Sequence, residues 1–117
     1  MDYSQLSDFE INKRVGIALG KELMPDDCQD FGLSGFPEVM LRNGDIKDYC
    51  NDPADAWPII TVNHISLMHD ESLGKWCAGN PYWVDGCEWQ LDIDAMDEDP
   101  LRAAMIFFLM TQDAKHA

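Results

Sequence analysis

The chain has few basic residues and no long apolar run. Only 8 of its 117 residues are Lys or Arg, against 22 Asp and Glu, and the formal net charge is −14. A field of that sign repels nucleic acid and anionic membranes, so direct nucleic-acid binding is excluded. The longest apolar run, residues 103–110, is far shorter than the roughly 20 residues that a membrane-spanning helix needs. The sequence therefore predicts a water-soluble protein.

Secretory and metal-binding signals are also lacking. Residues 1–5 contain neither the basic stretch nor the apolar core of a secretory signal, so we expect a cytoplasmic protein. In that compartment the four cysteines stay reduced thiols. No pair of them has the Cys-x₂-Cys spacing of a zinc knuckle or a redox motif. These cysteines are Cys28, Cys50, Cys77 and Cys87.

What the chain does contain is typical of one folded domain. Apolar residues make up 46% of the sequence, which is close to the roughly 45–50% of ordinary globular domains and argues against disorder. A length of 117 residues fits one domain, since domain sizes peak at about 100–150 residues. We therefore predict a single domain over residues 1–117.

The negative charge is concentrated in the middle of the chain. Residues 25–62 hold eight acids and two bases, and residues 63–99 hold nine acids and one base. Residues 1–24, with four acids and three bases, and residues 100–117, with one acid and two bases, are almost neutral. The pattern predicts nearly neutral terminal segments around an acidic middle.

Both terminal segments are predicted to form helices. Ser7 and Glu10 fit a capping box, in which Ser7 accepts from the Glu10 amide and the Glu10 side chain reaches back; an apolar stripe follows over residues 11–19. Near the other end, three acids precede Pro100, which suits the first position of a helix. Residues 103–110 are apolar on every face, so this helix is expected at the centre of the domain or in an oligomer interface, where a homodimer is the open alternative.

The middle of the chain is predicted to contain short strands and one more helix. Asn43-Gly44 favours a hairpin between strands at residues 39–42 and 46–49. Asp52-Pro53 favours a helix start, and Pro58 should keep that helix short or kink it. Three further segments complete the expectation: a loop at 25–37, a strand at 64–68 and a turn-rich stretch at 74–81.

A last strand is expected at residues 88–94, where Trp89, Leu91 and Ile93 alternate with polar residues and would form one half-buried face. The expected fold class is therefore α+β. Small antiparallel sheets or hairpins would pack on an N-terminal amphipathic helix and a buried C-terminal helix.

Three stretches of the sequence resemble one known family. They are Leu-Ser-Asp-Phe-Glu-Ile-Asn-Lys at 6–13, Asp-Tyr-Cys-Asn-Asp-Pro-Ala-Asp-Ala-Trp-Pro-Ile-Ile at 48–60, and Pro-Leu-Arg-Ala-Ala-Met-Ile-Phe-Phe-Leu-Met at 100–110. In these stretches the chain resembles the NinX-type proteins of tailed phages and prophages of enteric bacteria. The resemblance implies a phage-encoded accessory protein in the host cytoplasm. Because the family has no agreed activity, it supplies no catalytic residues.

Motifs of catalysis and cofactor binding are weak. Residues 16–21 resemble a phosphate-binding loop but have the wrong spacing. His64 and His69 are five residues apart, so one regular element cannot aim both at one ion; a zinc site that combines one of them with Cys77 or Cys87 stays open. Residues 92–99 resemble a calcium loop only in acid density, and we interpret them as a polar strand face followed by helix-capping acids. We assign no catalytic, cofactor-binding or metal-binding residue.

Large aromatic residues suggest a protein-binding patch. Core packing accounts for most of the tryptophans, but Trp76 and Trp83 flank a stretch with glycine, asparagine and proline and are candidate exposed anchors. Together with Asp92 and Asp94 they form the candidate protein-binding set.

Three functions remain compatible with these features. The favoured one is a non-enzymatic phage accessory protein whose acidic, aromatic-bearing middle binds a host or phage protein with a basic surface. A sharper version is a DNA mimic that inhibits a nucleic-acid-binding protein, which requires the acids to lie on one continuous face. The third is a metal-dependent enzyme.

Overall fold

The structure is a computed structural model. It describes residues 2–86 and 88–115, and for Ile93 and Asp94 it describes the backbone alone. Its elements, in chain order, are the 3₁₀ turn η1 (Tyr3–Gln5), α1 (Asp8–Ala18), the 3₁₀ turn η2 (Asp26–Cys28), α2 (Asp30–Leu33), β1 (Val39–Met40), β2 (Ile46–Lys47), α3 (Pro53–Val62), β3 (Ser66–Asp70), β4 (Lys75–Val84), β5 (Glu88–Asp97) and α4 (Pro100–Lys115).

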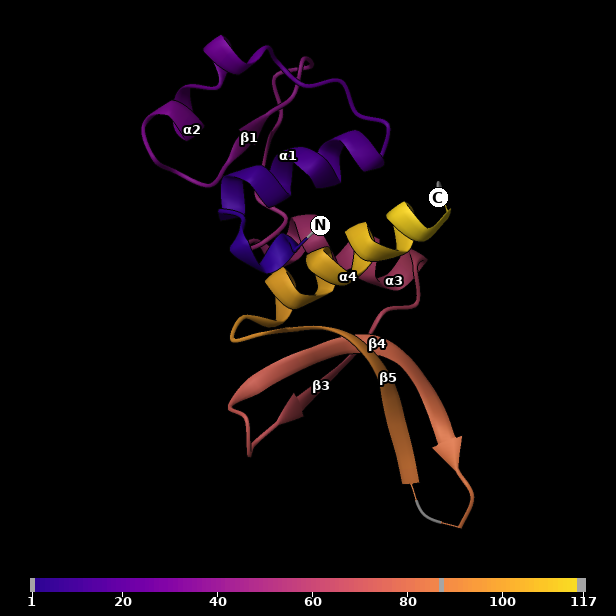
Figure 1. The fold of residues 1–117 in the computed structure, drawn as a ribbon. Helices are drawn as coiled ribbons and strands as arrows, with labels where there is room; N and C mark the ends of the chain where they lie inside the picture. The colour runs from indigo at the N-terminus through magenta and orange to yellow at the C-terminus, as the bar shows by residue number, and fades with distance from the viewer. Residues whose placement is uncertain (1, 87, 116–117) are drawn as a thin grey trace.

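These elements form an elongated α+β molecule, as the sequence predicts. Figure 1 shows α1, α2 and β1 at one end, α3 and α4 in the middle, and β3, β4 and β5 at the other end. The strands form an antiparallel pair, β1-β2, and an antiparallel sheet of order β3-β4-β5. The radius of gyration is 15.1 Å, whereas a compact domain of this length has about 13 Å. The excess reflects the β4-β5 hairpin, which projects from the body.

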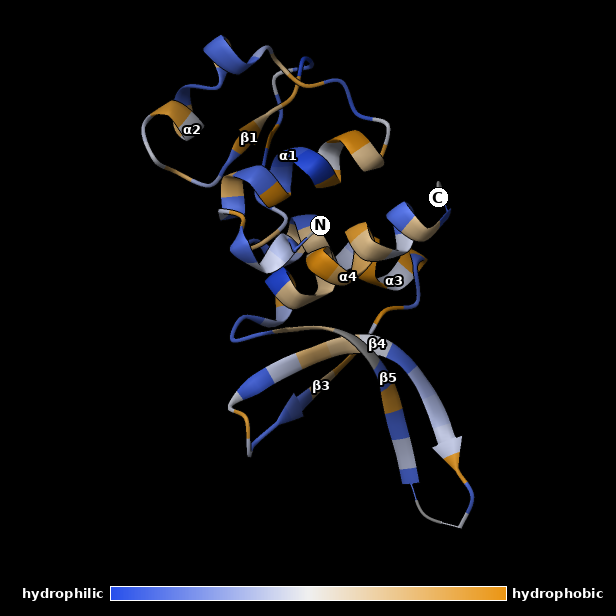
Figure 2. Cartoon of the chain, viewed as in Figure 1, coloured by the Kyte–Doolittle hydropathy of each residue, from blue (hydrophilic) through white to orange (hydrophobic). Residues whose placement is uncertain are grey.

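Helix α4 is the centre of the core. Its residues Ala103–Leu109 are all buried, and it packs against α1, α3 and all three strands of the larger sheet. Figure 2 shows apolar residues along α3 and α4, and also in α1, α2 and β1. Of the two places expected for a helix apolar on every face, the structure shows the centre of the domain.

The predicted helix starts are confirmed. The Ser7 hydroxyl accepts from the Glu10 amide at 3.2 Å, and the Asp52 carboxylate accepts from the Ala54 amide at 2.9 Å. The return bond from the Glu10 side chain is not among the hydrogen bonds of the described residues. The sequence predicts that Pro58 keeps α3 short or kinks it. Pro58 does not end the helix, which continues to Val62 and has 10 residues, and the kink stays a prediction. A proline inside a helix removes one hydrogen bond, and burial of Ile59 and Ile60 compensates for this loss.

Buried side-chain amides organise the N-terminal end of the molecule. The Gln29 side chain donates to the carbonyls of Met24 and Met40, each at 2.9 Å, and accepts from the Met40 amide at 2.8 Å. These bonds tie the segment before β1 to β1 itself. They also explain a correction: residues 25–37, predicted as a loop, contain the short helical turns η2 and α2. The hairpin at Asn43-Gly44 is confirmed with shorter strands, and Gly44 has the positive φ, 93°, that its turn requires.

The strands of the larger sheet differ from the prediction in extent. β3 begins at Ser66, since His64 adopts a left-handed conformation with φ 53°. The turn-rich interpretation of residues 74–81 is wrong, because β4 runs from Lys75 through Pro81 to Val84. Pairing with β3 and β5 outweighs the local turn signals. Pro81 lies beyond the segment that pairs with β3, where β4 has one neighbour and a proline is tolerated.

Arg102, in the first turn of α4, connects four segments of the chain. Its guanidinium donates to Asp8 at 2.6 Å and to Asp97 at 2.9 Å. It also donates to the backbone carbonyls of Ser4 and Leu6, at 3.2 and 2.8 Å. The side chain is only 13% exposed, so these bonds are largely shielded from water. Arg102 therefore fixes η1, the start of α1 and the end of β5 against α4.

Replacement of Arg102 tests this role. We expect Arg102→Met to lower the free energy of unfolding by about 3–5 kcal/mol, because it leaves Asp8 and Asp97 without their partner. Arg102→Lys should lower it by roughly 2 kcal/mol, since an ammonium cannot reproduce the branched donor geometry. Urea denaturation monitored by circular dichroism measures both values.

The matched control is Lys13→Met, which removes a pair whose acid, Asp26, is 84% exposed. That change should cost less than about 1 kcal/mol. A loss for Arg102→Met no larger than the loss for the control would contradict the assigned role.

Candidate functional site

The most prominent surface feature is the outer part of the β4-β5 hairpin, residues 80–92, which we call the hairpin arm. β3 pairs with β4 only from Lys75 to Gly79. Beyond Gly79, β4 pairs with β5 alone, up to the pair Val84–Glu88. Figure 1 shows this hairpin extending away from α3 and α4. The arm is therefore a two-stranded projection outside the core.

A β-bulge lies where the arm leaves the body. Ala78 pairs with Ala95, but the next residue, Gly79, pairs with Ile93, so that Asp94 is the extra residue of β5. A bulge bends its strand and increases its twist. Gly79, with no side chain, is buried at this point. The bulge thus sets the direction in which the arm points.

One face of the arm is aromatic. Because residues opposite each other in an antiparallel pair share a face, the pairs Pro81–Leu91 and Trp83–Trp89 lie on the same side. The two indole rings pack edge to face, with centroids 5.5 Å apart and planes at 65°. Trp83 is still 52% exposed and Trp89 65% exposed. Two large aromatic side chains therefore face solvent in a fixed relative orientation; these four residues are called the aromatic face.

The opposite face of the arm is polar and acidic. Tyr82 donates to the Gln90 side chain at 3.1 Å, and Gln90 donates to Glu88 at 3.2 Å. Asp92, opposite Asn80, is exposed on the same face. Residues 76–101 contain seven acids and neither Lys nor Arg. The arm thus combines an aromatic surface with a negative charge that no Lys or Arg of residues 76–101 balances.

The apolar surface continues from the arm onto the sheet. Met68, Cys77 and Met96 form one row across the three strands, and both methionines are exposed. Cys77 lies on the same side of β4 as Trp83, because alternate residues of a strand share a side and the two positions differ by an even number. The other side of the sheet packs on α4, with Leu67, Ala78 and Ala95 among its core contacts.

The structure separates the four sequence-predicted binding residues. Trp83 lies on the aromatic face and Asp92 on the polar face of the arm. Trp76 lies on the other side of the sheet, half-buried against the core, where its ring stacks on His69 at 5.1 Å between centroids. The side chain of Asp94 lies outside the described residues. Of the four residues, only Trp83 and Asp92 therefore lie on the arm, and they lie on opposite faces of it.

Trp89 is the residue that sequence reasoning missed. Its alternation with Leu91 and Ile93 suggested a half-buried face, but no element covers that face at the end of the arm. A signal was present in Asp85-Gly86, a turn dipeptide between two alternating aromatic segments, and Gly86 has a positive φ of 73°. It would have predicted the hairpin, although a two-residue loop at 85–86 would place Trp83 opposite Glu88 and not opposite Trp89.

Two acids of the segment 92–99 have structural roles. Asp97 accepts from Arg102, and Asp99 accepts from the Leu101 amide at 2.9 Å at the start of α4. Within residues 2–86 and 88–115, no group of three or more His, Cys, Asp or Glu side chains could hold a metal ion. His64 is exposed before β3, and Cys87, one of the thiols considered for a zinc site, lies outside the described residues. No helix in the described part of the chain is long and apolar enough to cross a membrane.

Comparison with known proteins gives a family. The family model described as Bacteriophage P22, NinX matches residues 2–112, from the residue before η1 to the last turns of α4. This match confirms the resemblance carried by residues 6–13, 48–60 and 100–110. No curated protein and no solved structure matches the chain.

The described thiols are poor nucleophiles. Burial raises the pKa of Cys50, and the nearby Asp8 carboxylate raises it further. Burial also raises the pKa of Cys77, with a smaller effect from Asp70. For Cys28 the neighbouring Asp27 carboxylate is the main cause of a raised pKa. A raised pKa keeps a thiol protonated at neutral pH, and the protonated form does not attack electrophiles.

Alkylation of the native protein tests this conclusion. At neutral pH, iodoacetamide should modify Cys50 and Cys77 at least tenfold more slowly than it does in urea-unfolded protein, because both thiols are buried and protonated. Peptide mass spectrometry resolves the rate for each cysteine. Fast alkylation of Cys50 in the native state would contradict the assignment and make Cys50 a candidate nucleophile.

Proposed function

The chain belongs to the bacteriophage P22 NinX family, and we propose that it is a non-enzymatic phage accessory protein that binds a basic partner protein through the hairpin arm. The partner is a host or phage protein with a cationic surface and an apolar groove. The observation that carries the proposal is the exposed, edge-to-face pair Trp83–Trp89 on an arm that contributes little to the core.

Exposed tryptophans at the end of an arm are unfavourable for a protein that acts alone. Contiguous exposed apolar surface of this kind usually marks an interaction site. Tryptophan is also enriched among the few residues that dominate binding energy, because it buries a large area with little loss of side-chain freedom. The aromatic face therefore fits the role of an anchor in a groove of the partner.

The charge of the arm supports a cationic partner. Asp85, Glu88 and Asp92 are exposed and have no ion pair with a described residue. Such uncompensated charges attract a basic surface over about a Debye length and orient it before contact. The acids would raise the association rate and select against acidic proteins, whereas the tryptophans would hold the complex together.

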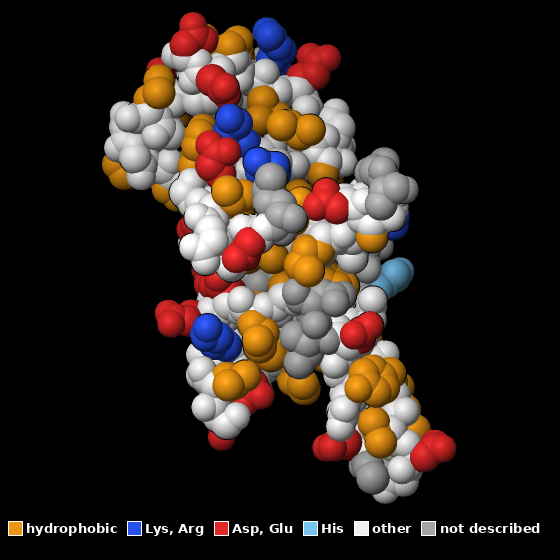
Figure 3. Space-filling view, viewed as in Figure 1, with side chains coloured by type: hydrophobic (Ala, Val, Ile, Leu, Met, Phe, Trp, Pro, Cys, Tyr) orange, Lys and Arg blue, Asp and Glu red, His pale blue; other side chains and the backbone are white. Residues whose placement is uncertain are grey.

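The DNA-mimic alternative receives less support from the arrangement of the acids. Figure 3 shows Asp and Glu side chains spread along the molecule, with Lys and Arg side chains mixed among them over the upper part. On the arm the acids share the surface with the aromatic face. A continuous row of carboxylates would be the stronger argument for mimicry.

Affinity capture with matched variants tests the proposal. The tagged protein is used as bait in a lysate of phage-infected host cells at physiological salt, and captured proteins are quantified by mass spectrometry. Trp89→Ala and Trp83→Ala should each weaken binding of the specific partner by roughly 30-fold or more, the effect of losing about 2 kcal/mol at an anchor. Asp92→Lys should weaken capture and reduce its dependence on salt concentration.

The control is Trp57→Ala, which removes another tryptophan, 61% exposed on α3 and away from the arm. Its capture should equal that of the unmodified protein. The proposal fails if no protein is captured, or if the arm variants capture as much partner as Trp57→Ala does. Capture that is unchanged by Trp83→Ala and Trp89→Ala but is abolished by added duplex DNA would favour mimicry instead.

A further inference from the structure

A cleft far from the hairpin arm separates the N-terminal end of the molecule from α3. Its volume is about 350 Å³, in the range of small-ligand sites. It lies between the C-terminal end of α1, the β1-β2 hairpin and the outer face of α3. The lining residues are Leu19, Lys21, Leu41, Asp45, Lys47, Tyr49, Ala54, Asp55, Pro58, Ile59, Val62 and Asn63.

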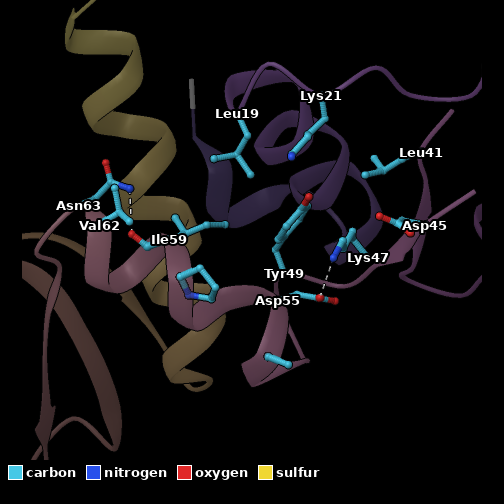
Figure 4. Close-up of a pocket in the computed structure, with 12 residues that line it drawn as sticks. Leu19, Lys21, Leu41, Asp45, Lys47, Tyr49, Asp55, Ile59, Val62 and Asn63 are labelled. Carbon is cyan, nitrogen blue, oxygen red and sulfur yellow. Dashed lines mark hydrogen bonds and ion pairs between the residues drawn. The ribbon is translucent and has the colours of Figure 1, made fainter. Parts of the chain in front are cut away.

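The lining is divided into an apolar and a polar part. Figure 4 shows Leu19, Ile59 and Val62 on one side of the cleft. On the other side, the polar ends of Lys21 and Tyr49 point into the space between α1 and α3, and those of Lys47, Asp45 and Asp55 lie beside them. A ligand that fills this cleft therefore needs one hydrocarbon end and one polar end.

Tyr49 presents an unused hydroxyl to this cleft. The residue is only 3% exposed, yet its hydroxyl has no hydrogen-bond partner among the side chains and backbone groups that the structure describes. Burial, together with the nearby Asp55 and Asp45 carboxylates, raises the pKa of Tyr49 to about 12, so that the hydroxyl stays protonated at neutral pH. The hydroxyl oxygen is not among the buried polar atoms that lack a partner, so it is open to the water of the cleft, and a ligand oxygen can replace that water as its acceptor.

The other charged side chains of the cleft differ in whether they already have a partner within the protein. Lys47 forms an ion pair with Asp55 at 3.5 Å, and Asp55 also accepts from the Asp48 amide at 2.9 Å. Asp45 accepts from the Asn43 side chain at 3.2 Å. Lys21, in contrast, forms no ion pair with any described residue. Asp45 has no ion pair with a described residue either, so the donors that the polar side still offers are one ammonium and one hydroxyl, beside one carboxylate without a cation.

We propose that this cleft binds a small monocarboxylate with an apolar body, whose carboxylate accepts from the Tyr49 hydroxyl and the Lys21 ammonium. The hydrocarbon part packs on Leu19, Ile59 and Val62. A single negative charge matches the one unpaired ammonium. A dianion such as a phosphate monoester would bring a second charge close to Asp45 and Asp55 and is disfavoured. The site is separate from the hairpin arm and does not depend on its proposed function.

Octanoate and its neutral analogue octanamide are the probes for this site. In a two-dimensional amide NMR titration of the full-length protein, octanoate should shift the signals of residues around the cleft, among them Lys21, Tyr49 and Val62. Octanamide, which has the same hydrocarbon chain but no charge, should bind about tenfold more weakly. Octyl phosphate should also bind more weakly than octanoate.

Two variants each remove one donor and should leave the fold intact. Tyr49→Phe removes only the hydroxyl, and Lys21→Met removes the charge of an exposed side chain that the fold does not require; each should weaken octanoate binding by about tenfold. Tyr82→Phe and Lys75→Met, which change the same residue types outside the cleft, should leave binding unchanged. The unshifted signals of residues far from the cleft show whether each variant is folded.

The proposal is overturned if millimolar octanoate causes no shifts around the cleft, or if octanamide binds equally well. It is also overturned if Lys21→Met and Tyr49→Phe bind octanoate as tightly as the unmodified protein. Since Trp83→Ala and Trp89→Ala do not touch the cleft, the outcome is independent of the capture experiment on the arm.

Discussion

The bonds of Arg102 are the constraint on which the arrangement of the molecule depends. The guanidinium donates to two carboxylates and two backbone carbonyls. Three of these acceptors belong to the N-terminal end of the chain, almost the whole chain length away from Arg102. A planar group with five donors can satisfy all four acceptors at once, whereas a lysine cannot. Because Arg102 is in the first turn of α4, these bonds place the helix at the centre of the core against α1 and the sheet.

The same contact determines where the hairpin arm begins. Asp97 is the last residue of β5 and an Arg102 partner, so the sheet end of the hairpin is fixed to the start of α4. Burial against α4 then holds Ala78 and Ala95. Beyond Gly79, β3 no longer pairs with β4, and the Trp83–Trp89 pair stabilises the arm internally. Burial against α4 holds the body together, whereas the outer part of the arm is held by the pairing of its own two strands.

The N-terminal end of the molecule is held together in a different way. Here the buried amides of Asn12 and Gln29 add hydrogen bonds to the apolar core, which reaches this end through Ile11, Val15 and Val39. Asn12 donates to the Pro37 carbonyl and to Asp48 at 2.8 and 2.9 Å and accepts from the Cys50 amide at 3.1 Å. Side-chain bonds of this kind join separate loops without filling all the space between them. The cleft beside Tyr49 remains open where this polar assembly meets the apolar face of α3.

Local signals in the sequence were sufficient for the elements that begin with a cap. Ser7, Asp52 and the acids before Pro100 each satisfy the first amides of a helix, and this chemistry depends only on residues three or fewer positions away. The even apolar coverage of residues 103–110 likewise required a buried helix, because no face of it can meet water. The hairpin at Asn43-Gly44 and the α+β class belong to the same group of predictions.

Contacts between distant residues decided the rest. The strand β4 forms through Gly79 and Pro81 because β5 supplies its hydrogen bonds, although both residues are poor strand formers by themselves. The exposure of Trp89 and the half-burial of Trp76 depend on where the sheet ends relative to α4, which alternation along one strand does not reveal. Lys21 and Tyr49 are 28 positions apart and meet only because α1 packs beside the hairpin. The sequence by itself thus determined the helices α1, α3 and α4, the fold class and the family, since these depend on neighbouring residues and on characteristic stretches of sequence. Tertiary structure alone determined which side chains reach solvent and which converge on a cleft, since burial is a property of the packed whole.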